Sequence, residues 1–284
     1  MPNLYVVATP IGNLEDITLR ALQTLREVKL IAAEDTRKTR KLLTHYSIKT
    51  PMTSYYEHSK RLKLDYILEQ LKDGDVAVVS EAGMPGLSDP GYDLIAAAYE
   101  KGIKVVPIPG PSAVTTALAV SGLPTDRFTY IGFLPNKAKA RQDLLKSVAD
   151  EAGAIVAFEA PHRVKESLKD ILDILGDRKI AVCRELTKVH EEVFRGTVSE
   201  AIEHFAEPRG EFTLVIGGKP KSKPQLTGNI EKQLHYRYLS GMTAKEAVAQ
   251  IGRETGLSRK ELYRAWLKLT SDRGINKDLS TRRS

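Results

Sequence analysis

Short apolar runs alternate with segments of helical spacing along the first 110 residues. Runs typical of strands occupy residues 4–9, 29–35, 75–80 and 104–110. Helical spacing of apolar positions occupies residues 19–28, 36–46, 62–74 and 92–102. Residues 75–80 are apolar almost throughout, as in a strand that is covered on both faces. This alternation predicts βαβ units and a mostly parallel sheet, so residues 1–110 are expected to form an α/β domain.

A second α/β region follows the segment PIPGPSA, whose three prolines and one glycine indicate a passage between domains. A small, apolar helix is expected directly after it, buried in the protein. Strands are expected at residues 128–134, 154–161, 179–186, 193–198 and 211–218, with helices at 137–152, 162–176 and 199–206. Because these strands are rich in β-branched and aromatic residues, residues 111–218 are predicted to hold a second, mixed sheet.

The last part of the chain has a different pattern. Residues 219–229, KPKSKPQLTGN, read as a polar linker, and residues 230–284 as a small helical domain with a flexible tail. Thr243 and Ser258 each begin an S/T-x-x-E capping box, and Gly256 ends the first of the two helices. Two short capped helices joined at a glycine predict a helix-turn-helix, with Trp266 on its core side.

Charge separates this last part from the rest. The whole chain carries a formal net charge of +7. Residues 219–284 contain fifteen Lys and Arg against six Asp and Glu, a net of +9, so the preceding residues are close to neutral. Such asymmetry favours an appended segment that binds a polyanion. A solvated, solubilising tail is the alternative interpretation.

Composition excludes several classes of protein. Apolar runs such as residues 94–98 are far too short to span a membrane, and the N-terminus lacks the features of a signal peptide. Cys183 is the only cysteine, which excludes an intramolecular disulfide framework and a multi-cysteine zinc site. Because the histidines do not cluster and H-E-x-x-H is absent, we expect no metal site, with a magnesium ion held by carboxylates as the open alternative. A cytoplasmic protein without a membrane partner is the simplest expectation.

Irregular loops rich in glycine and proline follow the predicted strands. They are ATPIGNLED, AEDTR, SEAGMPGLSDPG and PIPGPSA. Ligands of open α/β sheets bind at the carboxyl ends of strands, and glycine lets a backbone approach a ligand closely. The chain lacks both G-x-x-x-x-G-K-[ST] and, after its first strand, G-x-G-x-x-G. A nucleoside ligand without phosphates is therefore the favoured type of ligand.

The chain resembles one branch of the tetrapyrrole methylase superfamily in six segments: ATPIGNLEDIT, AAEDTRKTRKLL, SEAGMPGLSDPG, PIPGPSA, FEAPHR and EFTLVIGG. That branch is the family of small-subunit ribosomal RNA methyltransferases I, which methylate the ribose 2′-oxygen of a cytidine in the decoding region of 16S rRNA. The resemblance covers about residues 4–218, and the C-terminal helices also resemble the tail of this branch. It implies two α/β domains, S-adenosylmethionine (SAM) bound in the cleft between them, and a homodimer.

The resemblance also implies which residues hold the cofactor. They are Pro10, Gly83, Met84, Leu87, Ser112, Ala113, Phe158 and Leu214. Met84 stands where relatives carry an aspartate in a Gly-Asp-Pro segment, so backbone groups are expected to replace that side chain. Phe158 and Leu214 belong to strands that close over the adenine in relatives.

Methyl transfer to a ribose hydroxyl benefits from a general base. Candidate bases at strand ends are Glu34, Asp35, Glu81, Asp89 and Glu159. Arg37 and Arg163 are candidates for holding a phosphate of the RNA, and Arg259, Lys260, Arg264 and Lys268 for binding RNA through the helix-turn-helix. The alternative interpretation of the acidic residues and Arg37 is structural: an ion-pair and capping network, with Asp89 as the N-cap of the next helix.

Two other functions compete with RNA methylation. A methylase of a corrin precursor would share the fold, but it has no use for a strongly basic appendage. A DNA-binding regulator with a degenerate ligand domain would use the helix-turn-helix in a DNA major groove. The glycine-rich loops and the Ser-Ala pair of this chain are intact, which argues against a degenerate ligand domain. The C-terminal helices are also compatible with a packing or dimerisation module.

Overall fold

The computed structural model describes residues 2–55, 60–87, 91–220 and 226–280. The chain forms two compact units, Met1–Pro220 and Lys221–Ser284. The first unit contains two five-stranded sheets, and the second is helical in its described part.

The first sheet has the strand order β3-β2-β4-β1-β5, and every neighbouring pair is parallel. Its strands are β1 (Asn3–Val7), β2 (Leu30–Ala33), β3 (Met52–Ser54), β4 (Val76–Val79) and β5 (Lys104–Ile108). All residues of the central strands β2 and β4 are buried, as the continuous apolar runs predicted. The carboxyl ends of these strands therefore meet along one edge of the sheet.

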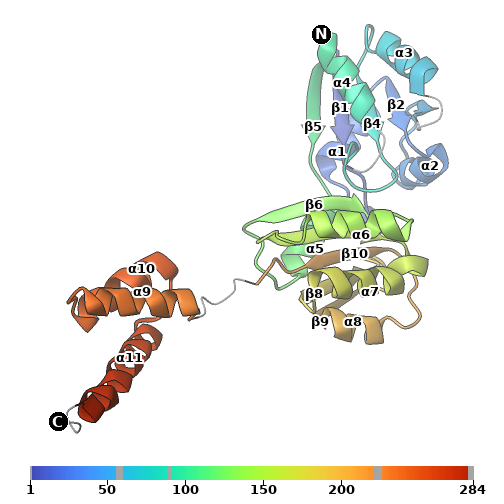
Figure 1. Cartoon of the computed structure of the whole chain (residues 1–284). Helices are drawn as coiled ribbons and strands as arrows, with labels where there is room; N and C mark the ends of the chain where they lie inside the picture. Colours follow the sequence, from blue (N-terminus) through green and yellow to red (C-terminus); the bar gives the residue numbers. More distant parts are fainter. Residues whose placement is uncertain (1, 56–59, 88–90, 221–225, 281–284) are drawn as a thin grey trace. The chain divides into compact units, whose positions relative to one another are not determined.

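Helices cover both faces of this sheet, as Figure 1 shows. Helices α1 (Leu19–Glu27) and α2 (Thr36–His45) share one apolar core with the strands. Helices α3 (Lys60–Gln70) and α4 (Tyr92–Glu100) pack on the opposite face. Because both faces of the sheet are buried, polar functional groups lie in the loops at the ends of its strands.

The second sheet has the order β6-β7-β10-β8-β9 and is mixed. Its strands are β6 (Phe128–Phe133), β7 (Ala154–Glu159), β8 (Lys179–Arg184), β9 (Glu192–Thr197) and β10 (Phe212–Ile216). Strands β6 and β7 are parallel, and the other neighbouring pairs are antiparallel.

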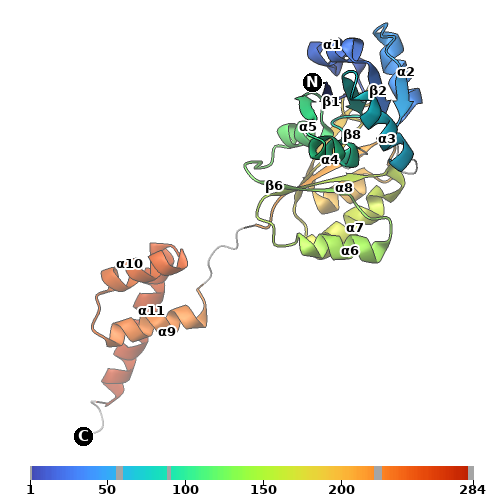
Figure 2. The ribbon, with the colours of Figure 1, turned by 90° about the horizontal axis from the view of Figure 1, so that it is seen from above.

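Its two faces have different covers. On one face lie α6 (Ala138–Ser147), α7 (Val164–Leu175) and α8 (Val198–His204), which Figure 2 shows beside this sheet. The short helix α5 (Ala113–Val120) packs on the other face, where it buries Val114, Ala117 and Leu118. Because α5 follows β5 directly, the segment PIPGPSA carries the chain from the first sheet to the second.

The second unit has a core of its own. It consists of α9 (Gly228–Leu239), α10 (Ala244–Thr255) and α11 (Arg259–Ser280), around Leu234, Ile251, Leu262 and Trp266. Both predicted capping boxes are present: Thr243 exchanges hydrogen bonds with Glu246, and Ser258 with Glu261. Gly256 ends α10 with a φ of 71°, which glycine adopts without a steric penalty.

The predicted class, two α/β sheets followed by a helical unit, is confirmed. Three elements were not predicted: the short 3-10 helix η1 (Leu14–Asp16), the three-residue strand β3, and helix α9, which begins within the stretch assigned to the linker. The predicted boundary between domains at Gly110 stays a prediction, because both sheets belong to one compact unit. In the described part of the chain, no helix is both long and apolar enough to cross a membrane.

Candidate active site

A cavity of about 350 Å³ lies where the loops at the carboxyl ends of the first sheet meet the α5 face of the second sheet. The first region contributes Ile11, Glu81, Ala82, Gly83, Met84 and Leu87. Helix α5 contributes Ser112, Ala113 and Val114, and the second sheet with its loops contributes Tyr130, Phe133, Phe158, Glu159, Ala160, Pro161, Cys183, Leu186, Glu211, Phe212 and Thr213. Its size and mostly apolar walls are typical of a site for a small organic molecule.

The loop after β4 is tied to the end of β1. Thr9 and Gly83 exchange two backbone hydrogen bonds of 2.9 Å, and the Thr9 hydroxyl donates to the carbonyl of buried Ser80. Gly83 and Gly86 have φ values of 78° and 83°, in the left-handed region that favours glycine. The glycines thus fold this segment back on β1 and present its backbone to the cavity.

The cofactor candidates divide into those that line the cavity and those that do not. Gly83, Met84, Leu87, Ser112, Ala113 and Phe158 line it. Pro10 is buried beside it, and its neighbour Ile11 lines the wall instead. Leu214 points to the opposite face of its sheet, into the core under α6, α7 and α8, so its side chain does not line the cavity and its role at the cofactor stays a prediction. Because side chains alternate along a strand, Thr213 faces the cavity and lines its wall. Phe212, at the start of β10, also borders the cavity, although its side chain packs in the same core as Leu214.

Aromatic rings form part of the second-sheet wall. Phe158 contacts Tyr130 and Phe133 edge-to-face, with ring centroids 5.4 Å and 5.2 Å apart. Phe133 is still 55% exposed, which leaves an apolar ring surface open at the cavity. Such rings offer a flat surface on which a purine or pyrimidine can pack.

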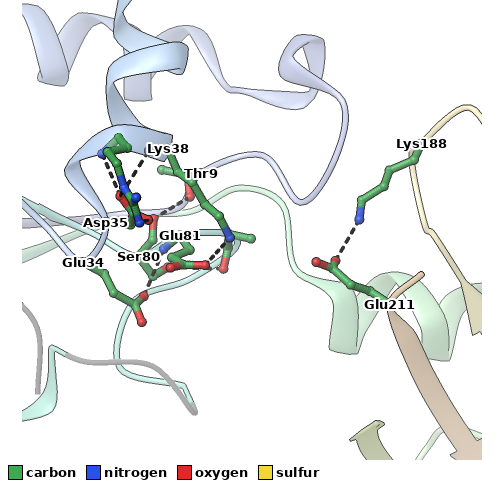
Figure 3. A network of polar contacts seen from close by, with 10 residues as sticks. Thr9, Glu34, Asp35, Lys38, Ser80, Glu81, Lys188 and Glu211 are labelled. Atoms are coloured by element: carbon green, nitrogen blue, oxygen red, sulfur yellow. Dashed lines mark hydrogen bonds and ion pairs between the residues drawn. The ribbon is translucent and has the colours of Figure 1, made fainter. Parts of the chain in front are cut away.

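Two of the candidate acids, Glu34 and Glu81, lie together at the strand ends. The backbone N–H of Glu81 donates a 3.1 Å hydrogen bond to the Glu34 carboxylate, and the Glu81 carboxylate accepts a hydrogen bond from Nζ of Lys38 (Figure 3). Burial raises the pKa of Glu34 above its ordinary value. The bond to Glu81 raises the pKa of Lys38, so this ammonium stays charged. Of the two acids, only Glu81 lines the cavity.

Asp35 has a structural position. It is the N-cap of α2, and its carboxylate accepts hydrogen bonds from the backbone N–H groups of Arg37 and Lys38. These bonds lower the pKa of Asp35, as expected for a capping carboxylate. Asp89 lies outside the described residues. The N-cap position of α4 is Gly91.

Glu159 and Arg163 form a buried ion pair of 2.7 Å, with their side chains 0% and 15% exposed. The Glu159 carboxylate also accepts hydrogen bonds from the backbone of Ala160, at 2.7 Å, and from the Ser167 hydroxyl. Arg163 was predicted to hold an RNA phosphate, but its guanidinium is turned inward to this carboxylate. The pair fixes the FEAPHR turn beside Phe158. Glu159 lines the cavity with its carboxylate engaged by these donors, and the binding of an RNA phosphate by Arg163 stays a prediction.

Two charged residues at the site, Lys188 and Glu211, were missed by the sequence analysis. Lys188 bridges Glu185 and Glu211 at 2.9 Å each, and Glu211 lines the cavity. Figure 3 shows the bond between Lys188 and Glu211. The same loop packs on Gly12, where an added Cβ would lie 2.5 Å from Cγ of Lys188. This contact joins the first loop to the second sheet, and no local pattern in the sequence reveals it.

The RNA candidates of the second unit share one helix. Arg259, Lys260, Arg264 and Lys268 are all exposed on α11, while Leu262 and Trp266 face the core. Arg37 is also exposed, with its side chain 90% accessible and a 3.4 Å contact to Asp35. The described residues contain no cluster of three or more acidic, histidine or cysteine side chains that could hold a metal ion.

Comparisons with known proteins extend this picture. Residues 3–202 match the model of the family of tetrapyrrole (corrin/porphyrin) methylases. A ribosomal RNA small subunit methyltransferase I from Synechocystis sp. is 48% identical over 275 residues, covering 95% of this chain and 99% of the relative. Another of that name, from Thermotoga maritima, is 54% identical over 222 residues, which cover 77% of this chain and 100% of the relative.

Solved structures with similar folds include a diphthine synthase, with a TM-score of 0.61 and 15% identity over 75% of this chain and 89% of that one. A uroporphyrin-III-C-methyltransferase from Thermus thermophilus gives a TM-score of 0.55 and 18% identity over 76% of this chain and 94% of that one. At these identities the likeness shows the fold alone. The family match and the high identity to full-length relatives show more: this chain belongs to the tetrapyrrole methylase family, in the branch of the ribosomal RNA small subunit methyltransferases I.

Proposed function

We propose that this protein transfers a methyl group from SAM to the ribose 2′-oxygen of a cytidine in 16S rRNA of the small ribosomal subunit. The observation that carries the proposal is the Glu81 carboxylate, held by Lys38 at an apolar cavity suited to a nucleoside. The names of the relatives at 48% and 54% identity support RNA as the substrate.

The residues of the cavity fit SAM. Its walls offer apolar side chains and aromatic edges for an adenine, chiefly Phe158, Met84 and Leu87. The backbone of Gly83 and the start of α5 at Ser112 and Ala113 offer polar groups, and the Ser112 side chain makes no capping bond within its own helix. The carboxylates of Glu81 and Glu211 have the charge that complements a sulfonium.

When bound, SAM supplies an electrophilic methyl group, and the protein supplies position and charge. Glu81 is the base that we assign. Its side chain is 38% exposed and lines the cavity, whereas Glu159 is locked in a buried ion pair and Asp35 caps a helix. Glu81 would accept the proton of the 2′-hydroxyl while that oxygen gains the methyl group that SAM gives up, with the sulfur leaving as a neutral thioether, and a base in this role is worth roughly 10²–10⁴-fold in rate. Lys38 orients this carboxylate, and Glu34 holds the backbone at Glu81.

The second unit is proposed to bind the RNA. Its four exposed cations on α11 fit a polyanion better than the alternative of a packing module. The major groove of A-form RNA is too narrow for a helix, so α11 would contact phosphates and the shape of the RNA. Binding through such contacts weakens steeply as salt concentration rises.

We propose that the functional protein is a cytoplasmic homodimer. Large exposed apolar side chains support a protein interface on the first unit: Tyr92 and Tyr99 on α4, and Phe128 on the edge strand β6. The proposed dimer is tested by the molar mass in solution, measured for the native chain and for Tyr99→Asp.

The proposed function is tested by offering three acceptors with SAM: unmodified small subunits, free 16S rRNA and a corrin precursor. We expect methylation of RNA and none of the corrin precursor. Methylation of the corrin precursor alone would overturn the proposal. The comparison of subunits with free RNA reveals which form of the substrate is recognised.

A further inference from the structure

Helix α2 has a one-sided charge that the proposed reaction has not yet used. From Thr36 to Thr50 the chain contains five Lys and Arg and no Asp or Glu. Thr39, Leu42 and Leu43 form the buried side of the helix, so Arg37, Lys38, Arg40 and Lys41 are all exposed. We propose that the basic face of α2, formed by Arg37, Arg40 and Lys41, grips the phosphates of the RNA strand next to the target nucleotide. This inference rests on the proposed function.

The charge of α2 is unlike that of other helices in the first unit. In the described part of this unit, the other helices are uncharged, mixed in sign or acidic. Helix α6, for example, carries Lys139, Arg141 and Lys146 with Asp143, and its Arg141 is buried in an ion pair with Asp170. Helix α4 carries Asp93 and Glu100. The first unit as a whole is close to neutral. A concentrated basic face on such a unit favours contact with an anion.

These cations are available to a ligand. Neither Arg40 nor Lys41 forms an ion pair with a described residue, and Arg37 has only the 3.4 Å contact to Asp35. The three side chains border a surface hollow together with Leu14, Thr36, Thr44 and His45. Guanidinium, ammonium and hydroxyl groups are the usual partners of phosphate oxygens in nucleic acids. The chemistry of the hollow therefore fits a phosphodiester backbone.

The basic face is linked to the candidate base. Lys38, on the same helix, donates to the carboxylate of Glu81 at the cavity (Figure 3). Residues on α2 advance by about 1.5 Å each, so Arg37, Arg40 and Lys41 lie within about one turn of Lys38. An RNA strand whose ribose reaches Glu81 would thus pass its neighbouring phosphates over this face.

The length of one relative supports a role for the first unit in RNA binding. The alignment with the Thermotoga maritima methyltransferase spans 222 residues, which is 100% of that relative and 77% of this chain. This length is close to that of the unit Met1–Pro220. A chain of that size has no room for a counterpart of the second unit as well. RNA contacts within the first unit would give such a relative a way to hold its substrate.

The test measures RNA binding directly, separately from methyl transfer. The full chain, the double variant Arg40→Gln/Lys41→Gln, and the control Lys139→Gln/Lys146→Gln are titrated with unmodified small subunits at several salt concentrations. The control removes the same charge from α6, which packs on the face of the second sheet opposite α5. Both control lysines are exposed and have no ion-pair partner among the described residues.

We expect the α2 variant to bind subunits roughly three- to ten-fold more weakly near 0.15 M salt, with a salt slope reduced by about 1 to 2. The control and a charge-conserving Arg40→Lys/Lys41→Arg variant should behave like the native chain, and the Kd for SAM should not change in any of them. An unchanged affinity and slope in the α2 variant, or an equal loss in the control, would overturn the inference. Absence of methyl transfer by the native chain would instead refute the proposed function, while the binding titrations still decide the role of α2.

Discussion

The backbone N–H of Glu81 donates a 3.1 Å hydrogen bond to the carboxylate of Glu34, 47 residues earlier in the chain. The bond joins the ends of two neighbouring parallel strands, β2 and β4. The partly buried carboxylate of Glu34 thus lies against the backbone of Glu81, whose own carboxylate lines the cavity. One of the two carboxylates therefore supports the other, and the two should respond differently to substitution.

Glu34→Gln should change stability in a pH-dependent way. Burial raises the pKa of Glu34 above 4.5, so the folded protein binds this proton more tightly than the unfolded chain. The stabilisation by Glu34 is complete below the unfolded-state pKa and is lost as pH rises through the folded-state pKa. The amide of Gln still accepts from Glu81. We therefore expect the Tm of Glu34→Gln to exceed that of the native chain at pH 8 and to approach it at pH 4.

Asp35→Asn is the matched control, because the neighbouring carboxyl has the opposite shift. The hydrogen bond from the N–H of Arg37 lowers the pKa of Asp35 below 3.8. Its contribution to stability is present above that value and is lost as pH falls through the folded-state pKa. Asp35→Asn should therefore lower Tm at pH 8 more than at pH 3. If the Tm of both variants changed with pH in the same way, the opposite pKa shifts of Glu34 and Asp35 would be contradicted.

Glu81→Gln should slow methyl transfer by roughly 10²–10⁴-fold, because the amide cannot accept the hydroxyl proton. Affinity for SAM, measured by calorimetry, should change little. Lys38→Met should give a smaller loss that depends on pH, since it removes only the group that orients Glu81. Turnover of Glu81→Gln at the native rate would remove Glu81 from the mechanism.

Arg163→Met should destabilise the fold by about 3–5 kcal/mol, because it leaves the fully buried Glu159 carboxylate without its ion-pair partner. Chemical denaturation measures this change. The exposed pair of Asp150 and Lys219 provides a control, and Asp150→Asn should leave the midpoint nearly unchanged. A stable Arg163→Met with weak RNA binding would instead restore the earlier assignment of Arg163 to the substrate.

Phe158→Ala and Leu214→Ala should separate cofactor binding from stability. Phe158 lines the cavity, so its loss should raise the Kd for SAM roughly ten-fold. Leu214 is fully buried on the helix side, so its truncation should cost about 2–5 kcal/mol of stability and leave the Kd near the native value. A folded Leu214→Ala variant with weakened affinity for SAM would contradict the placement of this side chain on the helix-covered face of the sheet.

The sequence predicted the sheets well, but it did not predict which face of a strand meets the cavity. All five residues of β10 are buried, so no alternation of polar and apolar positions distinguishes Leu214 from Thr213. Strand β3 is too short to show a period. Helix α9 fully buries only Leu234, with Ile230 and Tyr238 partly buried beside it, so its apolar stripe is narrow. In each case, contacts with residues that are distant in the sequence determine the local structure.

The candidate acids were found from the sequence, but their roles required distances. Glu34, Asp35 and Glu81 all follow strands, which is why they were selected together. Only the structure separates a supporting acid, a helix cap and an acid at the cavity. Glu211 was inside a recognised segment, EFTLVIGG, and its pairing with Lys188 depends on a contact across 23 residues.

The most direct test of the proposed reaction is the position of the transferred methyl group. Unmodified small subunits are incubated with methyl-labelled SAM and the native full-length chain, and the RNA is digested to nucleosides. The proposed function predicts label in 2′-O-methylcytidine at one site, and its near absence with Glu81→Gln. Label on a base, or no label in RNA although SAM binds, would contradict it.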